Sequence, residues 1–264
     1  MNKKRPQVLI TAGTTREYID SVRCWSNIFT GKTGLDIAQA ISAIADVTLL
    51  TSNVEHLRKI QSRRTSSTLT AILFESHADL LRLIAACLAR QTYDAVFMTA
   101  AVSDYIPAGA YTIIHRASTQ PPHQEVWVVD KVQQPKISSR HKSIAIVGKP
   151  TLKIIDQFRK VWKYRGLLFK FKLEVGLSDA ELIAVAQKSR KHSKADVIVA
   201  NTLEMARGQE PAALIIDQQS VLKVPRVQLA EVLLNELIRR LPIKAAGNRS
   251  RYGRQHRPPL SAQQ

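Results

Sequence analysis

A short apolar run that ends in a polar, glycine-bearing loop lies near the start of this 264-residue chain and constrains its fold most. Residues 8–10 (Val-Leu-Ile) predict a buried strand, and the loop after it ends at residues 30–34 (Thr-Gly-Lys-Thr-Gly), just before a helical pattern. Such a connection brings backbone N–H groups and the positive end of a helix dipole to one place. The segment therefore predicts an anion site in an α/β fold.

The same segment lacks both standard nucleotide-loop motifs. Gly31-Lys32-Thr33 looks like the end of a phosphate-binding G-x-x-x-x-G-K-S/T loop, but Ser26 stands where the first glycine belongs. The dinucleotide pattern G-x-G-x-x-G also fails, because only Gly31 and Gly34 have the required spacing. An ordinary strand-to-helix connection therefore stands beside the phosphate site as an alternative.

Apolar runs and amphipathic stretches alternate along the rest of the chain. Strands at 47–50 and 95–98 alternate with helices at 35–45 and 77–90, which is the order of a parallel sheet with right-handed crossovers. The later half predicts a helix at 151–162, a strand at 167–171, a helix at 178–192 with Ser178 and Glu181 at capping-box spacing, a strand at 197–200, a hairpin at 213–216 and 221–224, and a helix at 227–241.

These elements predict a doubly wound, mainly parallel, Rossmann-like α/β sheet with helices on both faces and a β-hairpin near the C-terminal end. Ligands of such sheets bind beyond the carboxyl ends of the strands. The segments that begin at Gly13, Ala100 and Asn201 follow or close predicted strands. We therefore expect all three at one edge of the sheet.

We assign residues 1–242 to a single α/β domain that contains one less regular segment. Residues 106–143 hold four prolines and many polar residues, and predict an irregular insertion that acts as a substrate-covering or dimer-crossing flap. Within it, residues 127–129 (Trp-Val-Val) predict a short strand. Residues 243–264 form a basic tail without acidic residues, which predicts disorder.

The formal net charge of +18 is high, and about +13 remains without the tail. A basic chain without its tail suits anionic substrates and also nonspecific nucleic-acid binding, so charge alone does not separate these functions.

The two cysteines do not suggest a disulfide framework, and the seven histidines lack the spacing of metal ligands. No apolar stretch reaches the roughly 18 residues of a membrane span, and no signal peptide is recognisable. We expect a cytoplasmic protein without a membrane partner.

Five ordered blocks match one family. The first spans residues 10–34 and reads I-T-A-G-x-T-R-E-x-I-D-x-V-R, followed by S-N-x-x-x-G-K-x-G. The others are residues 100–105 (A-A-V-S-D-Y), 136–139 (K-I-S-S), 171–174 (F-K-L-E) and 200–204 (A-N-T-L-E). Together they resemble phosphopantothenoylcysteine synthetase, also called phosphopantothenate–cysteine ligase, in its stand-alone, eukaryote-like form. The resemblance covers about residues 6–242.

The resemblance implies an amide-forming ligase of coenzyme A biosynthesis. ATP or CTP, with Mg²⁺, would activate 4′-phosphopantothenate as an acyl-nucleotide, and the amine of L-cysteine would then displace the nucleotide. The resemblance also implies a homodimer in which loops near the active site can come from the second subunit. Two alternatives remain: a diverged paralogue with weak or no ligase activity, and a basic, nucleic-acid-associated binding protein.

The resemblance further implies roles for single residues. Asn27 matches the asparagine that binds and converts the intermediate. Lys136 matches the lysine that neutralises the triphosphate. Lys131 and Lys142 are competitors for that role, because the insertion places Lys136 much farther from Asp104 in the sequence than is usual in the family. The implied nucleotide-binding residues are Gly13, Thr14, Gly31, Lys32, Ala101, Asp104, Phe171 and Lys188. The expected substrate-binding residues are Arg16, Arg23 and Asn201. Phe29 departs from the family, which usually has serine there.

Overall fold

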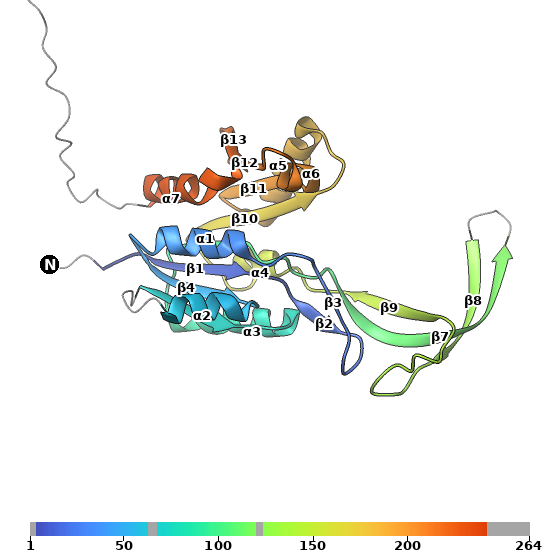
Figure 1. Cartoon of the computed structure of the whole chain (residues 1–264). Helices are drawn as coiled ribbons and strands as arrows, with labels where there is room; N and C mark the ends of the chain where they lie inside the picture. Colours follow the sequence, from blue (N-terminus) through green and yellow to red (C-terminus); the bar gives the residue numbers. More distant parts are fainter. Residues whose placement is uncertain (1–3, 63–67, 120–123, 242–264) are drawn as a thin grey trace, which may run out of the picture.

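The computed structural model describes residues 4–62, 68–119 and 124–241, and an eight-stranded sheet forms its centre (Figure 1). In spatial order its strands are β13 (Val221–Pro225), β12 (Ala212–Ile216), β11 (Val197–Thr202), β10 (Leu167–Glu174), β6 (Ala95–Met98), β1 (Gln7–Ala12), β4 (Asp46–Thr51) and β5 (Leu69–Leu73). The strands from β11 to β5 are parallel, whereas β12 pairs antiparallel with both of its neighbours, β11 and β13. The predicted mainly parallel, Rossmann-like sheet and its C-terminal hairpin are confirmed.

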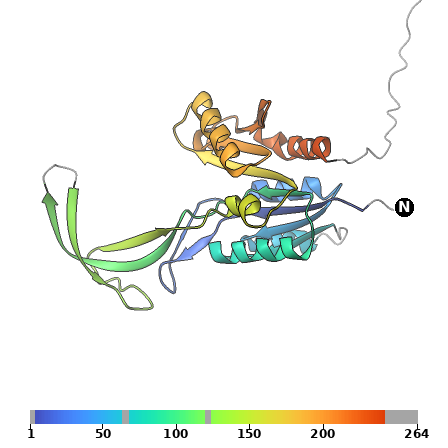
Figure 2. The ribbon, with the colours of Figure 1, turned by 180° about the vertical axis from the view of Figure 1, so that it is seen from behind.

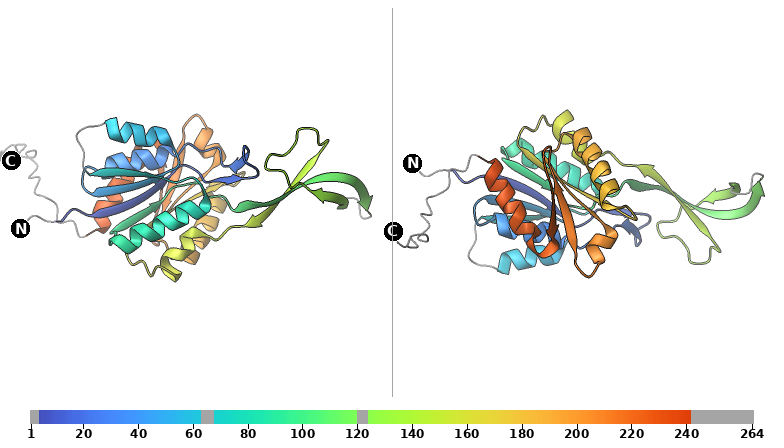
Figure 3. Two further views of the ribbon diagram at one scale, coloured as in Figure 1. Left: turned by 90° about the horizontal axis from the view of Figure 1, so that it is seen from below. Right: turned by 90° about the horizontal axis from the view of Figure 1, so that it is seen from above.

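Helices cover both faces of this sheet (Figures 2 and 3). They are α1 (Lys32–Ile41), α2 (Val54–Ser62), α3 (His77–Arg90), α4 (Ile154–Lys160), α5 (Asp179–Ser193), α6 (Leu203–Arg207) and α7 (Leu229–Arg240), the last preceded by the 3-10 turn η1 (Arg226–Gln228). Successive side chains of a strand point to opposite faces. Accordingly, Phe169 of β10 packs in the cluster that contains α1 and α7, and its neighbour Leu168 packs in the cluster that contains α3 and α4.

Helix α5 begins as the sequence predicts. The Ser178 side chain accepts a hydrogen bond from the Glu181 N–H, and the Glu181 carboxylate accepts one from the Ser178 N–H at 2.9 Å. This capping box satisfies donors that the first helical turn leaves without partners. It fixes the start of α5 at Asp179, in the loop that follows β10.

The segment 106–143, predicted to be irregular, consists mostly of two strands that join a third, directly after the segment, in an antiparallel sheet, so that prediction is wrong. The strands of this sheet are β7 (Tyr105–Thr119), β8 (Gln124–Lys131) and β9 (Ile144–Pro150), in the order β8-β7-β9. The pairing shifts register between Pro107 and Gly109, so this proline marks a bulge and not a break in the strand. We call this sheet the arm, because it projects away from the main sheet (Figures 1 and 3).

Several short elements were not predicted from the sequence. The polar loop after β1 folds as a hairpin of β2 (Arg16–Tyr18) and β3 (Cys24–Ser26), and α2, β5, β9 and α6 also lack a predicted counterpart. The predicted strand at 127–129 is confirmed within β8. The basic tail at 243–264 lies outside the described residues. Across the described residues, none of the helices combines the length and apolarity that a membrane span requires.

Candidate functional site

The loops that follow β1 and β6 meet at the topological switch point of the main sheet. From β1 the chain builds outward through β4 and β5, and then returns to place β6 on the other side of β1. A parallel bridge joins Thr14 to Ala101, and the Ala101 N–H donates to the Gly13 carbonyl at 2.9 Å. Open α/β sheets bind ligands in this crevice. The expectation that Gly13, Ala100 and Asn201 lie at one edge of the sheet is confirmed.

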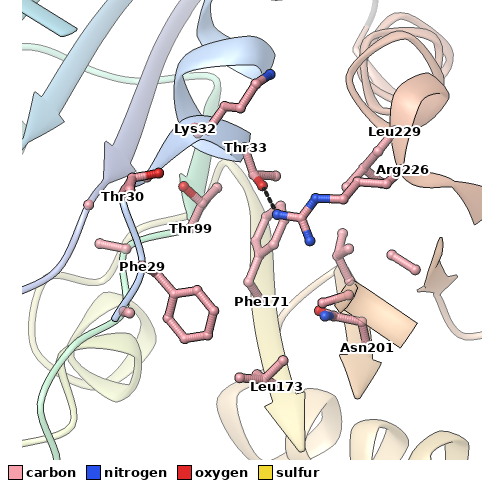
Figure 4. Close-up of a pocket in the computed structure, with 18 of the residues that line it drawn as sticks. Phe29, Thr30, Lys32, Thr33, Thr99, Phe171, Leu173, Asn201, Arg226 and Leu229 are labelled. Carbon is pink, nitrogen blue, oxygen red and sulfur yellow. Dashed lines mark hydrogen bonds between the residues drawn. The ribbon is translucent and has the colours of Figure 1, made fainter. Parts of the chain in front are cut away.

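A pocket of about 200 Å³ opens at this edge (Figure 4). Its walls come from the loop before α1, the first turn of α1, the loop after β6, and the ends of β10 and β11, with η1 and α7 closing one side. Six of the residues assigned from the sequence line it: Gly13, Gly31, Lys32, Ala101, Phe171 and Asn201. Segments far apart in the chain therefore converge on one cavity.

Gly31 shapes the part of the pocket at the N-terminus of α1. It is the N-cap residue, with φ of +80°, and a Cβ atom added there would lie 2.2 Å from the Gly13 backbone nitrogen. Only glycine fits such a backbone at such a close approach. No side chain caps α1, and its first turn holds no acidic residue. The positive end of this helix dipole thus remains available to an anion.

The opposite part of the pocket is aromatic and apolar. The rings of Phe29 and Phe171 flank the cavity, with Leu173 below them and the Asn201 amide beside them (Figure 4). The Asn201 Nδ2 donates to the Thr202 carbonyl at 3.1 Å, which orients the amide. An aromatic wall with a few fixed polar groups suits a ligand that carries a planar ring.

Arg226 is a pocket residue that sequence reasoning missed. Its Nη2 donates to the Thr33 Oγ1 at 2.7 Å, and its guanidinium projects into the cavity (Figure 4). By contrast, the Lys32 ammonium, which the sequence favours, pairs with Asp36 at 2.6 Å. Arg226 follows the hairpin about 190 residues after α1 in the chain, so no local motif marks it.

Asn27 lies at the rim, next to the loop after β6. Its backbone N–H donates to the Thr14 Oγ1 at 3.2 Å, and its Nδ2 donates to the Ala101 carbonyl at 3.3 Å. Thr14 is itself buried, and its N–H donates to the Ser52 Oγ at 2.8 Å. Thr14 thus fixes the backbone of Asn27. Asn27 itself is exposed, next to Ala101, which lines the pocket.

Asp104 lines a second pocket, of about 260 Å³, that adjoins the first along Ala101 and Phe171. The Asp104 carboxylate pairs with Lys153 from the segment before α4. Lys170 also lines this second pocket, where burial lowers the pKa of its ammonium. Two connected compartments, one with an open helix N-terminus and one with lysines, can accept two anionic groups.

Six of the sequence-predicted residues are absent from the lining of both pockets: Thr14 and Asn27, which lie next to it, and Arg16, Arg23, Lys136 and Lys188. The same holds for Lys131 and Lys142, the competitors for the role of Lys136. Lys188 is exposed on α5. Lys136 lies in the loop between β8 and β9, and this loop docks on the β2–β3 hairpin through a hydrogen bond from the Ser21 N–H to the Pro135 carbonyl at 2.9 Å.

Asp20 is the centre of this docking contact. Its side chain is only 2% exposed and accepts hydrogen bonds from the Ile137 N–H at 3.0 Å and from the Arg23 guanidinium at 2.6 Å. Burial by itself would raise the pKa of Asp20, but hydrogen bonds from the backbone N–H groups of Val22, Ile137 and Arg23, with the Arg23 guanidinium, lower it to about 2. Arg23 is therefore engaged in holding this loop.

The described part of the chain contains no cluster of three or more His, Cys, Asp or Glu side chains that could hold a metal ion. Asp104, the acidic residue among the site residues assigned from the sequence, lines the second pocket and pairs with Lys153. Any divalent cation at these described residues would therefore take most of its ligands from a bound molecule or from water.

This arrangement defines a doubly wound α/β protein with a ligand pocket at its switch point. Residues 3–119 match the family model described as the DNA/pantothenate metabolism flavoprotein C-terminal domain. This match confirms the resemblance that was predicted from the sequence.

Two curated relatives are similar over most of the chain. The coenzyme A biosynthesis bifunctional protein CoaBC of Thermococcus kodakarensis is 32% identical over 235 residues, which are 88% of this chain and 50% of that protein. The protein of the same name from Borreliella burgdorferi is 26% identical over 87% of this chain and 50% of its own length. The chain thus spans about half the length of the curated relatives it matches.

Two solved structures share the fold. The DNA/pantothenate metabolism flavoprotein from Streptococcus pneumoniae has a TM-score of 0.70 and 26% identity, covering 88% of this chain and 98% of that one. A Cab2 mutant in complex with phosphopantothenate-cysteine has a TM-score of 0.63 and 15% identity, covering 90% of this chain and 87% of its own. At this identity, the second likeness concerns the fold alone.

Proposed function

We propose that this protein is a phosphopantothenate–cysteine ligase that uses ATP or CTP. The observation that supports this most is the pocket at the switch point, which combines an uncapped helix N-terminus with an aromatic wall. The first feature suits phosphates, and the second suits a nucleobase. The name of the Thermococcus relative, a bifunctional protein of coenzyme A biosynthesis, agrees with this activity.

In the proposed complex, the nucleotide lies across the pocket. Its triphosphate would lie at the first turn of α1, where Gly31 permits close approach of the backbone. Its base would pack on Phe171, with the Asn201 amide in reach of the edge of the ring. The adjoining pocket near Asp104 and Lys170 would take the second anionic substrate, 4′-phosphopantothenate.

The proposed chemistry has two steps. In the first, a carboxylate oxygen of 4′-phosphopantothenate attacks the α-phosphorus, the bond from that phosphorus to the bridging oxygen breaks, and pyrophosphate leaves. In the second, the neutral amine of L-cysteine attacks the acyl carbon, and the nucleoside monophosphate leaves with the electrons of the carbon–oxygen bond. The amine nitrogen releases a proton as the amide forms. Catalysis of both steps depends mainly on positioning and electrostatic stabilisation.

Asn27 is the proposed catalytic residue of the second step. Its amide is fixed at the pocket rim by the bonds to Thr14 and Ala101. A side-chain amide can donate to the acyl oxygen as negative charge develops there, and its oxygen can accept a hydrogen bond from the attacking amine. Lys136 is proposed to neutralise the triphosphate, and we propose that it does so from a second subunit.

We propose that Mg²⁺ enters as the magnesium complex of the nucleotide. Magnesium keeps several water ligands and binds substrate phosphates, so a nucleotide enzyme does not require a preformed protein cage for it. Asp104 is the acidic residue suited to contact this complex, through a water molecule.

A homodimer is part of this proposal. On β8 of the arm, four consecutive apolar residues are exposed: Val126, Trp127, Val128 and Val129. Since consecutive strand residues point to opposite faces, both faces of β8 present apolar surface. Such a surface on a projecting arm suits an interface, and the occupant we propose is the arm or body of a second copy of this chain.

The test is pyrophosphate release by the purified full chain with 4′-phosphopantothenate, L-cysteine and Mg²⁺, with ATP or CTP as the nucleotide. We expect release that requires 4′-phosphopantothenate, and formation of the cysteine amide detected by mass spectrometry. The ratio of the two rates would give the nucleotide preference. No release with either nucleotide, from a protein with a cooperative thermal transition, would overturn the ligase function.

A further inference from the structure

Arg226 is held in the pocket wall by hydrogen bonds to neutral groups, and these bonds do not neutralise its positive charge. Its backbone N–H donates to the Pro211 carbonyl at 2.7 Å, which fixes the start of η1. Its Nη2 donates to the Thr33 Oγ1, also at 2.7 Å. Within residues 4–62, 68–119 and 124–241, no carboxylate forms an ion pair with this guanidinium.

Lys32, the cation that the Gly-Lys-Thr segment offers, is placed differently. Its ammonium pairs with Asp36 on the next turn of α1, and the side chain points away from the cavity (Figure 4). The Lys32 side chain is 77% exposed. Its charge is therefore partly compensated and directed to solvent. Lys172, which also lines the pocket, pairs with Glu174 at 2.5 Å. Arg226 lines the same pocket, and its guanidinium projects into the cavity (Figure 4).

We propose that Arg226 is a phosphate-binding residue of this pocket and that Thr33 positions it. The inference rests on the proposed nucleotide function and names a binding residue that the sequence motif does not contain. A guanidinium has five N–H donors in a planar fork. With one of them on Thr33, others remain for two phosphate oxygens in a bidentate contact beside the first turn of α1.

A phosphate-binding role of Arg226 depends on its charge, whereas a purely structural role does not. A bond between η1 and the first turn of α1 could simply join the end of the hairpin to α1. In that case, its loss would lower the melting temperature and would affect all ligands alike. A phosphate-binding role instead predicts a loss confined to ligands that carry phosphates.

The experiment is isothermal titration calorimetry on the full chain with Arg226→Gln. We expect the affinity for ATP and CTP to fall about 10- to 100-fold, the usual effect of losing a charge-assisted hydrogen-bond pair. The affinity for adenosine and cytidine should change less than about twofold, because neither carries a phosphate. Arg226→Lys keeps the charge but loses the fork and should give an intermediate loss. It also serves as the test if the glutamine variant melts at a lower temperature.

Lys223→Gln is the matched control. Lys223 lies on β13, three residues before Arg226, and pairs with Asp179 on α5 at 2.8 Å. This substitution removes one positive charge from the same region, and it should leave the affinity for ATP and CTP within about twofold, because an exposed pair is worth little. An equal loss in both variants would show a general effect of net charge and would overturn the role of Arg226.

The remaining outcomes separate this inference from the proposed function. Nucleotide binding that is unchanged in Arg226→Gln would overturn the inference and support the nucleotide function. If the wild-type chain binds neither nucleotide, inorganic triphosphate is the deciding probe. Its binding in a manner that requires Arg226 would support the phosphate site and overturn the nucleotide function, and its failure to bind would overturn both.

Discussion

Gly31 is the residue at which the pocket depends most directly on backbone geometry. Its φ of +80° costs a residue with a Cβ about 1–2 kcal/mol, and the added atom would also contact the Gly13 backbone nitrogen at 2.2 Å, where no side chain can move aside. We expect Gly31→Ala to lower the free energy of unfolding by at least about 2 kcal/mol and to weaken nucleotide binding. Chemical denaturation and calorimetry measure the two effects.

Gly176→Ala is the control for this substitution. Gly176 has a similar φ of +70°, but nothing lies within 4 Å of the position of its Cβ. It should therefore show only the backbone cost of about 1–2 kcal/mol and no change in nucleotide affinity. Equal destabilisation by both substitutions would mean that the close approach between Gly31 and Gly13 contributes nothing.

Asn27 gives a second prediction for a single residue. If its amide stabilises the acyl oxygen in the second step, Asn27→Ala should lower kcat about 10²- to 10³-fold, as removal of one such donor does elsewhere. Because the first step does not need this donor, the acyl-nucleotide should accumulate and be detectable by mass spectrometry. Asn235→Ala on the exposed side of α7 is the control. A loss of both half-reactions together would instead indicate a structural role for Asn27.

At the scale of the elements, hydrophobic periodicity predicted the main strands and helices of the central sheet, but it did not predict most of the arm. Buried parallel strands such as β1 and β6 are continuous apolar runs, and α3 and α5 show helical spacing, so their types and order could be predicted. The arm strands are exposed on both faces and are interrupted by a proline at a bulge, so they lack the pattern of a half-buried strand. In addition, β7 pairs with β9, which is distant in the sequence, so a local pattern does not reveal this pairing.

The residues of the candidate site likewise fall into those that a local sequence pattern predicts and those that it does not. Residues that belong to a glycine-bearing loop or follow an apolar run, such as Gly13, Gly31 and Ala101, could be placed at the pocket from the sequence. Arg226 could not, because its position depends on how the C-terminal hairpin and η1 fold back on α1. Conversely, Lys32 has the right local motif, but its neighbour Asp36 on the same helix pairs with its charge.

The loop between β8 and β9 gives a prediction that depends on pH. Because the pKa of Asp20 is lowered from 3.8 to about 2, its contribution to docking is present above pH 3.8 and is lost as the pH falls towards 2. The amide resonance of Ile137, which donates to Asp20, should therefore titrate with a midpoint near 2 in NMR spectra. In Asp20→Asn this titration should be absent. A midpoint near 3.8 would show that the loop is not docked in solution.

At the scale of the whole molecule, Lys136 is separated from the pockets of its own chain. It lies in the arm loop that docks on the β2–β3 hairpin and does not line the pocket of its own chain. Asn27, on the other hand, lies at the rim of that pocket. If the arm reaches a second copy, Lys136 can complete the site of the partner, and each site then needs Asn27 from one subunit and Lys136 from the other.

A mixture of two inactive variants tests this arrangement. We expect Asn27→Ala and Lys136→Ala each to lose most ligase activity alone. After unfolding and refolding together in equal amounts, half of the dimers are mixed, and each mixed dimer holds one site with both residues intact. Activity should therefore recover to about a quarter of the wild-type value. If Lys136 acts within its own chain, each site of a mixed dimer still lacks one residue, and the mixture should stay as inactive as its components.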